Sequence, residues 1–467
     1  MEIYKDFLRL LPSELKFKIL SYLDLKDLLS ATQVSKDWYT ICNDNFLWRE
    51  ICIKEQICTN VGENDTQIFK SNRKIDSEIS FWKMCYIRQC NLEKSWRSRQ
   101  TNSFSKVIEY NAEMIGCIQI NEKYLVSASL DAVINVFLIN TGENFKKLLG
   151  HRSGVILLKL LDNIIVSGDG DGIIKIWNIE NGQCIFNLNG HTARISCLSV
   201  YKCKLVSGSC DFSLRFWNFE TGNCLKVFNG HTAAVRCTDY NGTFVISGSS
   251  DKTVKIWNTN TGECIKTLEG HRYDVVALSF DGLNIVSASI GAIYIWNAET
   301  GSIKNNLMGC KDCFAFKEKN DLISNKNMFA FINVLYSPNP FVRFKYDIKI
   351  CDFATGEYLQ TITDETEECS QVKCMQFVLN FVLTSTYGST IKLWDIKSGK
   401  FIRNLININW HEDGYYVHGF RANETKLVVL TQSNTYKNKI IIINFDFQCK
   451  GINFMRSTMQ NHNCSVT

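Results

Sequence analysis

Apolar and polar residues alternate through much of the chain between residues 150 and 297. Around Val254, Lys255 and Ile256 every second side chain is apolar, and a turn of Asn, Thr and Gly follows before the next such stretch begins at Cys264. A period of two is typical of half-buried β-strands, because successive side chains point to opposite faces of a sheet. The pattern predicts short strands joined by tight turns.

The alternation lies inside a unit that returns every 40 residues. The unit runs from Gly-His through an apolar stretch, a Ser-Gly or Ser-Ala turn and an acid to a Trp. The histidines that mark its clearest copies are His151, His191, His231 and His271. A fixed period of this length is typical of repeat architectures, and four short strands per unit make one blade of a β-propeller.

Weaker copies of the unit can be found by following the position of the Trp. This position is occupied in turn by Phe137, Trp177, Trp217, Trp257, Trp296, Cys351, Trp394 and Ile443. Eight positions predict a mainly β fold with an eight-bladed propeller over residues 105–448, although a miscount of the first or last copy would leave seven blades. The longest step places an insertion in blade six. Its extra residues are expected within residues 323–346, where Pro338 and Pro340 favour a surface loop.

The two ends of the predicted propeller complete one blade together. Residues 106–110 form a strand-like segment ahead of the first copy, and the last copy stops after its strand at residues 440–443. A ring left open would expose a sheet edge. We therefore expect residues 106–110 to pair with residues 439–445 and close the ring.

Helical spacing replaces the alternation near the start of the chain. Leu15, Ile19 and Leu23 recur at intervals of four residues, which is typical of one face of a helix. Pro12 suits a first helical turn. Residues 1–50 are therefore predicted to form a domain of three short helices. The candidate caps of the later helices are Asp24 and Ser35.

Residues 51–104 are predicted to be a helical linker, because Trp82, Tyr86 and Cys90 also recur at helical spacing. Its charges alternate with aromatic residues, so we interpret them as the solvated face of a docked helix rather than as a basic binding patch. The basic residues concerned are Arg73, Lys74, Lys83, Arg88, Arg97 and Arg99. Residues 449–467 form a short C-terminal tail.

Composition and charge narrow the function classes. The 467 residues are 45% hydrophobic and carry a formal net charge of +5, which is too small for this length to indicate a nucleic-acid partner. The N-terminus lacks the apolar core of a signal peptide, and no later run reaches about 18 apolar residues. We expect no membrane partner and a location in the cytoplasm, the nucleus or both.

The 20 cysteines predict neither disulfides nor a metal site. Cys310 and Cys313 form a lone Cys-x-x-Cys without the two further ligands that zinc requires. The Gly-Asp-Gly-Asp-Gly run at residues 168–172 aligns with ordinary blade turns rather than a calcium or phosphate loop. Several cysteines recur in register with the repeat and are expected in strands as small apolar residues: Cys184, Cys224 and Cys264, and also Cys197 and Cys237.

No Ser/His/Asp or Cys/His arrangement stands outside the repeat, so an enzyme is not expected and no cofactor is predicted. A buried imidazole or carboxylate within a blade must find a hydrogen-bond partner, at a cost of roughly 1–3 kcal/mol if it does not. The histidines and acids of the repeat are therefore interpreted as structural.

The repeat resembles the WD-repeat family, whose units begin with Gly-His and end with Trp-Asp, varied here to Trp-Asn in four copies. The resemblance implies that His, Ser, Asp and Trp of one blade share a hydrogen-bonded network. In the third clear copy these residues are His231, Ser247, Asp251 and Trp257.

The N-terminal helices resemble the F-box, through Leu-Leu-Pro at residues 10–12 and Leu-Trp-Arg at residues 47–49. In that family the segment binds the adaptor that joins substrate receptors to the cullin of an SCF-type ubiquitin ligase. The residues to which the resemblance assigns adaptor binding are Leu10, Leu11, Pro12, Leu15, Ile19, Leu20, Leu28, Val34, Trp38, Leu47 and Trp48. The alternative is a helical cap on the propeller, with Leu11 and Leu15 turned inward.

Nearly the whole chain resembles the F-box/WD-repeat receptors that recognise phosphorylated degrons. In that subfamily arginines bind the degron from two positions per blade, the fifth residue after the blade His and the residue before the turn Asp. Here the first position holds Ile156, Ser196, Arg236 and Val276, and the second holds Gly170, Cys210, Ser250 and Ile290.

Arg236 is the one residue of the eight that keeps the charge of the subfamily. It follows the apolar Val235, so strand alternation should turn it away from the packing face. Arg194 lies near the same loops. The substrate-binding residues we predict are Arg236, Arg194, Ser196, Ile156, Val276, Ser250 and Cys210.

The resemblance implies a non-catalytic receptor subunit of an SCF-type ubiquitin ligase. Its expected partners are the adaptor, a cullin reached through the adaptor, and a protein target that is acidic or phosphorylated. Dimerisation is not expected, because too few residues precede Leu10 for the dimerising segment of the subfamily. The alternative function is a WD-repeat scaffold that acts independently of a ligase.

Overall fold

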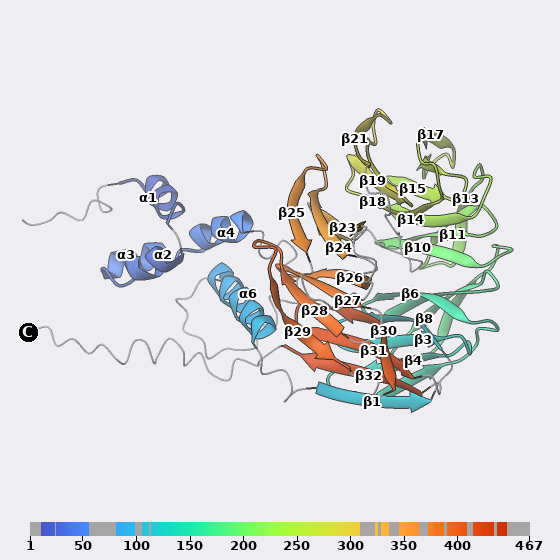
Figure 1. The fold of residues 1–467 in the computed structure, drawn as a ribbon, viewed down its shortest axis with the longest axis horizontal. Coiled ribbons are helices and arrows are strands. Elements are labelled where there is room, and N and C mark those ends of the chain that lie inside the picture. Colours follow the sequence, from blue (N-terminus) through green and yellow to red (C-terminus); the bar gives the residue numbers. More distant parts are fainter. Residues whose placement is uncertain are drawn as a thin grey trace, which may run out of the picture. The chain divides into compact units, whose positions relative to one another are not determined.

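The computed structural model describes residues 11–23, 25–55, 81–98, 105–111, 114–308, 323–325, 328–335, 345–363, 372–386, 390–408, 414–433 and 437–445. The described residues belong to two compact units, one that contains the helices and one that contains the strands (Figure 1).

The first unit begins with four short helices: α1 (Ser13–Leu20), α2 (Leu25–Ala31), α3 (Lys36–Cys42) and α4 (Asn45–Lys54). Ser35 caps α3 as predicted, since its hydroxyl accepts a hydrogen bond from the amide of Trp38 at 3.3 Å. The prediction of three helices was wrong, because Asp44 caps a further one. The carboxylate of Asp44 accepts from the amide of Phe46 at 2.7 Å and starts α4. Asp24 lies outside the described residues.

The helices share one apolar core. Leu20, Leu28, Leu47 and Trp48 are each about 1% exposed and pack in a single cluster. The indole Nε1–H of Trp48 donates to the carbonyl of Cys42 at 2.7 Å, which satisfies its buried donor.

Helix α6 (Phe81–Arg97) forms within the predicted helical linker and packs against α4. The ring of Tyr86 meets Trp48 edge-on at 5.5 Å, and the ammonium of Lys83 lies 5.4 Å from the Trp48 ring centre. Lys83 is buried and contacts the side chain of Asn43, so its interpretation as a solvated charge was wrong. Burial lowers the pKa of Lys83 and raises that of Cys42 to about 11.

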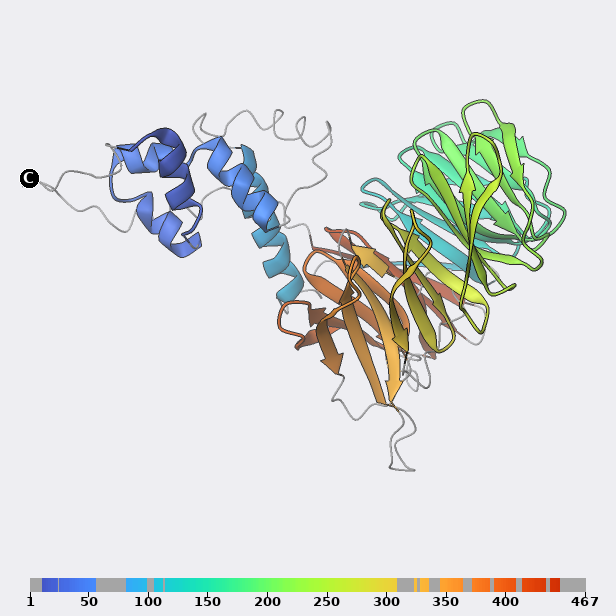
Figure 2. The same ribbon diagram turned by 90° about the horizontal axis from the view of Figure 1, so that it is seen from above.

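The second unit is a ring of eight antiparallel four-stranded sheets (Figures 1 and 2). Blades one to four are β2 (Ile115–Ile120), β3 (Tyr124–Ser129), β4 (Ile134–Leu138), β5 (Asn144–Leu148); β6 (Val155–Leu161), β7 (Ile164–Asp169), β8 (Ile174–Asn178), β9 (Cys184–Leu188); β10 (Ile195–Tyr201), β11 (Lys204–Ser209), β12 (Leu214–Asn218), β13 (Asn223–Phe228); and β14 (Val235–Tyr240), β15 (Phe244–Ser249), β16 (Thr253–Asn258), β17 (Cys264–Glu269). Blades five to eight are β18 (Val275–Phe280), β19 (Asn284–Ser289), β20 (Ala292–Asn297), β21 (Ile303–Met308); β22 (Ile323–Asn325), β23 (Met328–Leu335), β24 (Lys345–Asp352), β25 (Tyr358–Thr363); β26 (Val372–Val378), β27 (Phe381–Thr386), β28 (Thr390–Asp395), β29 (Phe401–Asn407); and β30 (Tyr415–Ala422), β31 (Lys426–Ser433), β32 (Lys437–Asn444), β1 (Ser105–Asn111).

The core of the propeller lies between neighbouring blades. Trp257 of blade four is fully buried in one cluster with Val206 and Phe228 of blade three, and the two rings lie 5.6 Å apart. Each sheet is therefore covered by the next, which explains why both faces of the second and third strands are apolar or hydrogen-bonded. The first strands of most adjacent blades contact one another, as β10 contacts β14.

The cysteines in register occupy equivalent strand positions, as expected. Cys184, Cys224 and Cys264 each pair with the Trp of their own blade at a break in register. Cys224 and Cys264 are nevertheless exposed, because the fourth strand of a blade has no neighbour on its outer side. Cys197 and Cys237, on first strands, are buried.

Residues 323–346, where the insertion in blade six was predicted, include β22, β23 and the start of β24. Residues 309–322 and 336–344 lie outside the described residues. Strands β23 and β24 pair along their full length. Phe329 and Phe331 bury one face of this hairpin, which is why it forms strands rather than a loop. Pro338, Pro340, Cys310 and Cys313 are outside the described residues.

The ring closes as predicted. Strand β1 pairs antiparallel with β32, from Ser105 with Ile443 to Asn111 with Lys437. Ile108 packs on the buried cluster shared by blades eight and one, whereas Val107 on the opposite face of β1 is 54% exposed.

Replacing Ile108 with Asp should lower the Tm of the chain by about 5 °C or more, because a charge in this cluster costs several kcal/mol or expels β1. Thermal unfolding followed by circular dichroism measures the effect. Val107→Asp puts the same charge on the exposed face of the same strand and should change Tm little. Equal Tm values for the two variants would show that β1 does not hold the ring closed.

Candidate substrate-binding face

A hydrogen-bonded network in blade four joins the four residues that the repeat predicts. Nδ1 of His231 lies 2.6 Å from a carboxylate oxygen of Asp251, and Nε2 lies 2.7 Å from the hydroxyl of Ser247. The indole of Trp257 donates to the same hydroxyl at 2.8 Å. With Nδ1–H directed at the carboxylate, Nε2 accepts from Ser247, so the ring is neutral. Both ring nitrogens of His231 are therefore used in hydrogen bonds within the blade.

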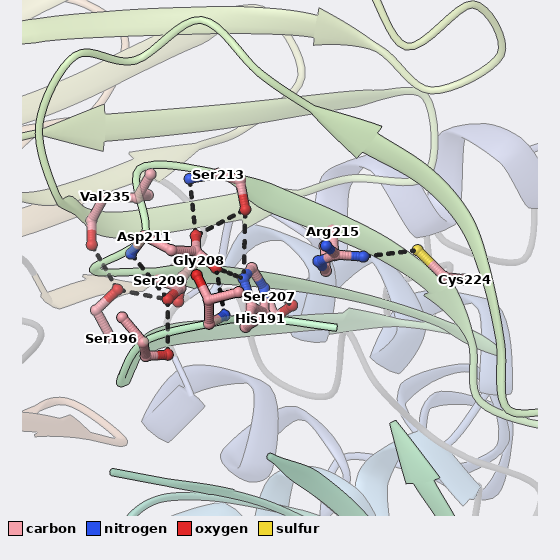
Figure 3. A network of polar contacts seen from close by, with 12 residues as sticks. His191, Ser196, Ser207, Gly208, Ser209, Asp211, Ser213, Arg215, Cys224 and Val235 are labelled. Atoms are coloured by element: carbon pink, nitrogen blue, oxygen red, sulfur yellow. Dashed lines mark hydrogen bonds and ion pairs between the residues drawn. The ribbon is translucent and has the colours of Figure 1, made fainter. Parts of the chain in front are cut away.

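The equivalent network of blade three is drawn in Figure 3. Nδ1 of His191 lies 2.7 Å from Asp211, and burial is the main reason that the pKa of His191 is lowered. Burial alone would raise the pKa of Asp211. Hydrogen bonds from the hydroxyl and amide of Ser213 and from the amide of Thr192 outweigh it and hold this pKa at about 2.

Two blades vary the acid. In blade two, Asp169 takes the place of a turn acid and lies 2.8 Å from Nδ1 of His151, while it accepts from two backbone amides of its own turn. The run at residues 168–172 is thus a blade turn, as predicted. In blade five, Ser289 meets Nδ1 of His271 at 2.7 Å, and burial lowers the pKa of this imidazole to about 4.

The networks bring two sets of loops to one end of the propeller. In blades one to four the turn after the second strand is bonded through its backbone to the loop ahead of the first strand, as in the bond from the amide of Ser250 to the carbonyl of Ala234 at 2.9 Å. The same bond joins Cys210 to Arg194 at 2.9 Å. We call this end the loop face and define it by residues 114, 130–133, 150–154, 170–173, 190–194, 210–213, 230–234, 250–252, 270–274 and 290–291, with the first residues of the adjoining first strands.

A bulge marks the start of the first strand in seven blades of the described part of the chain. The pairing skips one residue there, as between Val235 with Ser249 and Cys237 with Gly248. The skipped residues are Gly116, Ile156, Ser196, Arg236, Val276, Lys373 and His418. A bulge re-aims the side chain of the unpaired residue, so the bulge together with strand alternation turns Arg236 outward.

Arg236 joins the two predicted sets of substrate-binding positions. Its Nε–H donates to the hydroxyl of Ser250 at 2.7 Å, and its Nη2 lies 3.7 Å from a carboxylate oxygen of Asp274. The side chains of Arg236 and Asp274 are 47% and 43% exposed, so the guanidinium reaches solvent beside a carboxylate. Asp274 has no counterpart among the predicted residues.

The other predicted positions differ in what they offer to a ligand. Arg194 is exposed, whereas Ile156, Val276 and Cys210 are half-buried. Ser196 is buried, and its hydroxyl lies 2.5 Å from the carbonyl of Val235 and 3.0 Å from that of Gly208. Its proton is therefore engaged by the backbone of two blades.

Lys373 and His418 hold the bulge position in blades seven and eight and were missed in the sequence. The two side chains lie 3.4 Å apart, from Nζ to Nδ1. Burial, and then the charge of Lys373, lower the pKa of His418 to about 4. Each follows a Val as Arg236 does, but their blades lack the Gly-His from which the position can be counted.

The loop face also exposes large apolar side chains that the sequence analysis did not select. They are Met114, Leu130, Phe212, Tyr273 and Ile290. Among the described residues, no group of three or more His, Cys, Asp or Glu could hold a metal ion. No described helix is both long and apolar enough to cross a membrane.

The predicted adaptor-binding residues divide into an exposed set and a buried set. Leu15, Ile19 and Val34 are 48%, 41% and 64% exposed, and Pro12 is exposed too. Tyr22 and Phe46, which were not predicted, are exposed on the same unit. The other predicted adaptor-binding residues form the core of the helical unit or lie partly within it: Leu20, Leu28, Trp38, Leu47 and Trp48. Leu11 is half-buried, and Leu10 lies outside the described residues.

Comparisons with known proteins divide the chain in the same way. The F-box-like family matches residues 8–54, and the WD domain, G-beta repeat, matches residues 142–178, 182–218, 222–258 and 262–297.

Two relatives and one solved structure extend these matches. F-box/WD repeat-containing protein 7 of Drosophila melanogaster is 38% identical over 154 residues, which cover 33% of this chain and 12% of that protein. Probable E3 ubiquitin ligase complex SCF subunit sconB of Arthroderma benhamiae is 27% identical over 165 residues, 31% of this chain and 25% of that protein. The crystal structure of the computationally designed Ika8 protein is similar with a TM-score of 0.57 and 27% identity over 71% of this chain and 96% of that one. The matched segments thus span a quarter or less of these two relatives.

The buried histidines predict a loss of stability in acid. The pKa of His271 and that of His418 are each about 4 in the folded chain, below the ordinary value of 6.5, so the unfolded chain binds more protons between these values. The contribution of these histidines to the free energy of unfolding is complete above pH 6.5 and falls as the pH drops toward 4. At pH 4.5 the loss is on the order of 2 kcal/mol per histidine. Urea unfolding at pH 7 and pH 4.5 measures this difference. His271→Asn should reduce it, and an unchanged difference in this variant would contradict the assignment.

Proposed function

We infer that this chain, which joins an F-box-like segment to WD40 repeats, is the substrate-recognition subunit of an SCF-type E3 ubiquitin ligase. The observation that carries the proposal is the presence in one chain of two separate exposed surfaces, an apolar set on the F-box-like helices and the loop face of the propeller. A relative named as an SCF subunit supports the assignment. The chain recruits and orients a target and performs no chemistry itself.

The exposed apolar set of the F-box-like helices is proposed to bind the adaptor, and through it the cullin. Leu15 and Ile19 are four residues apart on α1, so they share one face of that helix. Burying these side chains against a partner removes apolar surface from water, which stabilises the complex by roughly 25 cal/mol per Å² of apolar surface buried. Within its own unit Leu15 lies outside the core, because its side chain is 48% exposed. The buried members act indirectly, by holding the helices together.

The loop face is proposed to bind the target. It combines exposed apolar side chains with the exposed arginines Arg152, Arg194, Arg236 and Arg272. Arginine can form two hydrogen bonds to one carboxylate or phosphate group, so these arginines offer hydrogen-bond donors to an anionic group of the target. Because only one of the described bulge positions holds an arginine, apolar contacts should contribute much of the affinity for the target.

The double substitution Leu15→Ala with Ile19→Ala should weaken adaptor binding at least tenfold and leave the helices folded, because it removes exposed anchors only. Binding of the purified chain to the adaptor, measured by calorimetry, gives the result. Leu283→Ala removes an exposed leucine from the propeller, outside the loop face, and serves as the matched control. Unchanged affinity in the double variant would refute this docking surface and favour a scaffold that acts without a ligase.

Arg236→Ala should reduce target capture several-fold while adaptor capture stays constant, since the two surfaces belong to separate units. Quantitative mass spectrometry of the proteins retained by the tagged chain in cells, with the proteasome inhibited, measures both. Lys147→Ala removes an exposed charge from β5 and should leave both unchanged. A target set that ignores Arg236→Ala and phosphatase treatment alike would exclude anion recognition at this position.

A further inference from the structure

The guanidinium of Arg236 is exposed to solvent but also contacts two side chains of the protein. Of the nitrogen atoms of its guanidinium, Nε is bonded to Ser250 and Nη2 faces Asp274. A phosphate that formed two hydrogen bonds with this group would have to share it with the carboxylate of Asp274 or displace that carboxylate. Asp274 is therefore an anion of the protein itself, placed beside the one arginine among the bulge positions.

The Arg236–Asp274 pair is too exposed to be strong. At 3.7 Å and with both side chains nearly half exposed, such a pair is worth up to about 1 kcal/mol. A ligand can thus displace Asp274 from Arg236. The carboxylate nevertheless stays on the loop face, anchored by its backbone at the start of β18, and repels any anion bound nearby.

The repulsion depends on the charge of the ligand. Two unit charges about 5 Å apart in water repel by about 0.8 kcal/mol, and by more where solvent is partly excluded. A phosphate monoester carries nearly two charges at pH 7, whereas a neutral side chain pays no such cost. Tyr273 beside Asp274 and Ile290 in the next turn of the same blade offer apolar contacts to a neutral ligand.

We propose that Asp274 is a specificity-determining residue, which biases the loop face toward mainly apolar target segments and against phosphorylated ones. This inference rests on the proposed target-binding function of the loop face. It concerns the class of target segment that the loop face prefers. A site lined by arginines without a neighbouring carboxylate would prefer phosphorylated segments, and we attribute the different preference of this chain to the carboxylate of Asp274.

The test uses the full chain in complex with its adaptor and three immobilised peptide libraries with degenerate flanking positions. The central residue is phosphothreonine in the first library, threonine in the second and leucine in the third. Wild-type chain should bind the phosphothreonine library no more than about threefold better than the threonine library. Asp274→Asn should raise binding to the phosphothreonine library about tenfold, or about 1.4 kcal/mol, and leave binding to the leucine library unchanged.

A matched control removes the same charge elsewhere on the loop face. Asp171 is exposed in the turn of blade two, away from Arg236, and Asp171→Asn should change binding to the phosphothreonine library less than twofold. Adding Arg236→Ala to Asp274→Asn should abolish the gain, and 0.5 M salt should reduce it by screening.

The outcomes separate the inference from the function on which it rests. If the wild-type chain binds the libraries but Asp274→Asn leaves the ratio between the phosphothreonine and threonine libraries unchanged, Asp274 does not determine specificity. An equal gain from Asp171→Asn would show a general charge effect and also overturn the inference. Failure of wild type and variant to bind any library would reject target binding at the loop face itself.

Discussion

The structure depends on one buried hydroxyl group in each of the well-preserved blades. In blade four, the hydroxyl of Ser247 donates to His231 and accepts from Trp257, so that a side chain from the second strand, one from the third and one from the loop ahead of the first strand meet at one oxygen atom. All three polar groups are buried and would cost free energy without these partners. In blade seven, Thr384 supplies the oxygen to Trp394 at 2.9 Å, so the contact persists where the histidine is lost.

This contact also determines where the proposed ligand-binding residues lie. It holds the Gly-His loop against the turn that follows the second strand, and the bulge begins immediately after that loop. The bulge residue is thus presented at the same end of the propeller in blade after blade, whatever its identity. The framework is repeated while the exposed residues vary, which is how a propeller can change its ligand without changing its fold.

The sequence predicts the repeated framework well, because its signals are local and recur at a fixed period. The network of His231, the eight third-strand positions and the pairing of the chain ends were all confirmed by the structure. The candidate site was predicted less completely. Lys373 and His418 could not be counted from a Gly-His that their blades lack, and Asp274 becomes relevant only because Arg236 lies beside it in space.

Burial was the other property that the sequence could not supply. Ser196 and Arg236 occupy equivalent positions, yet Ser196 is short enough to bond to the carbonyl of Val235 in the next blade, while the longer Arg236 extends to solvent. Lys83 was interpreted as solvated, and its burial against Trp48 follows from the way α6 packs on α4. Such differences arise from tertiary packing. The alternation and periodicity of residues along one segment do not contain this information.

The pairing of β1 with β32 has a consequence for the synthesis of the protein. Asn111 pairs with Lys437, so the first strand of the propeller leaves the ribosome long before its partner is made. At roughly 5–20 residues per second this interval lasts on the order of tens of seconds. During that time Ile108 lacks the part of its apolar cluster that blade eight supplies, and the nascent chain carries an unpaired strand. The edge of β1 therefore needs protection from aggregation until the last blade has been made.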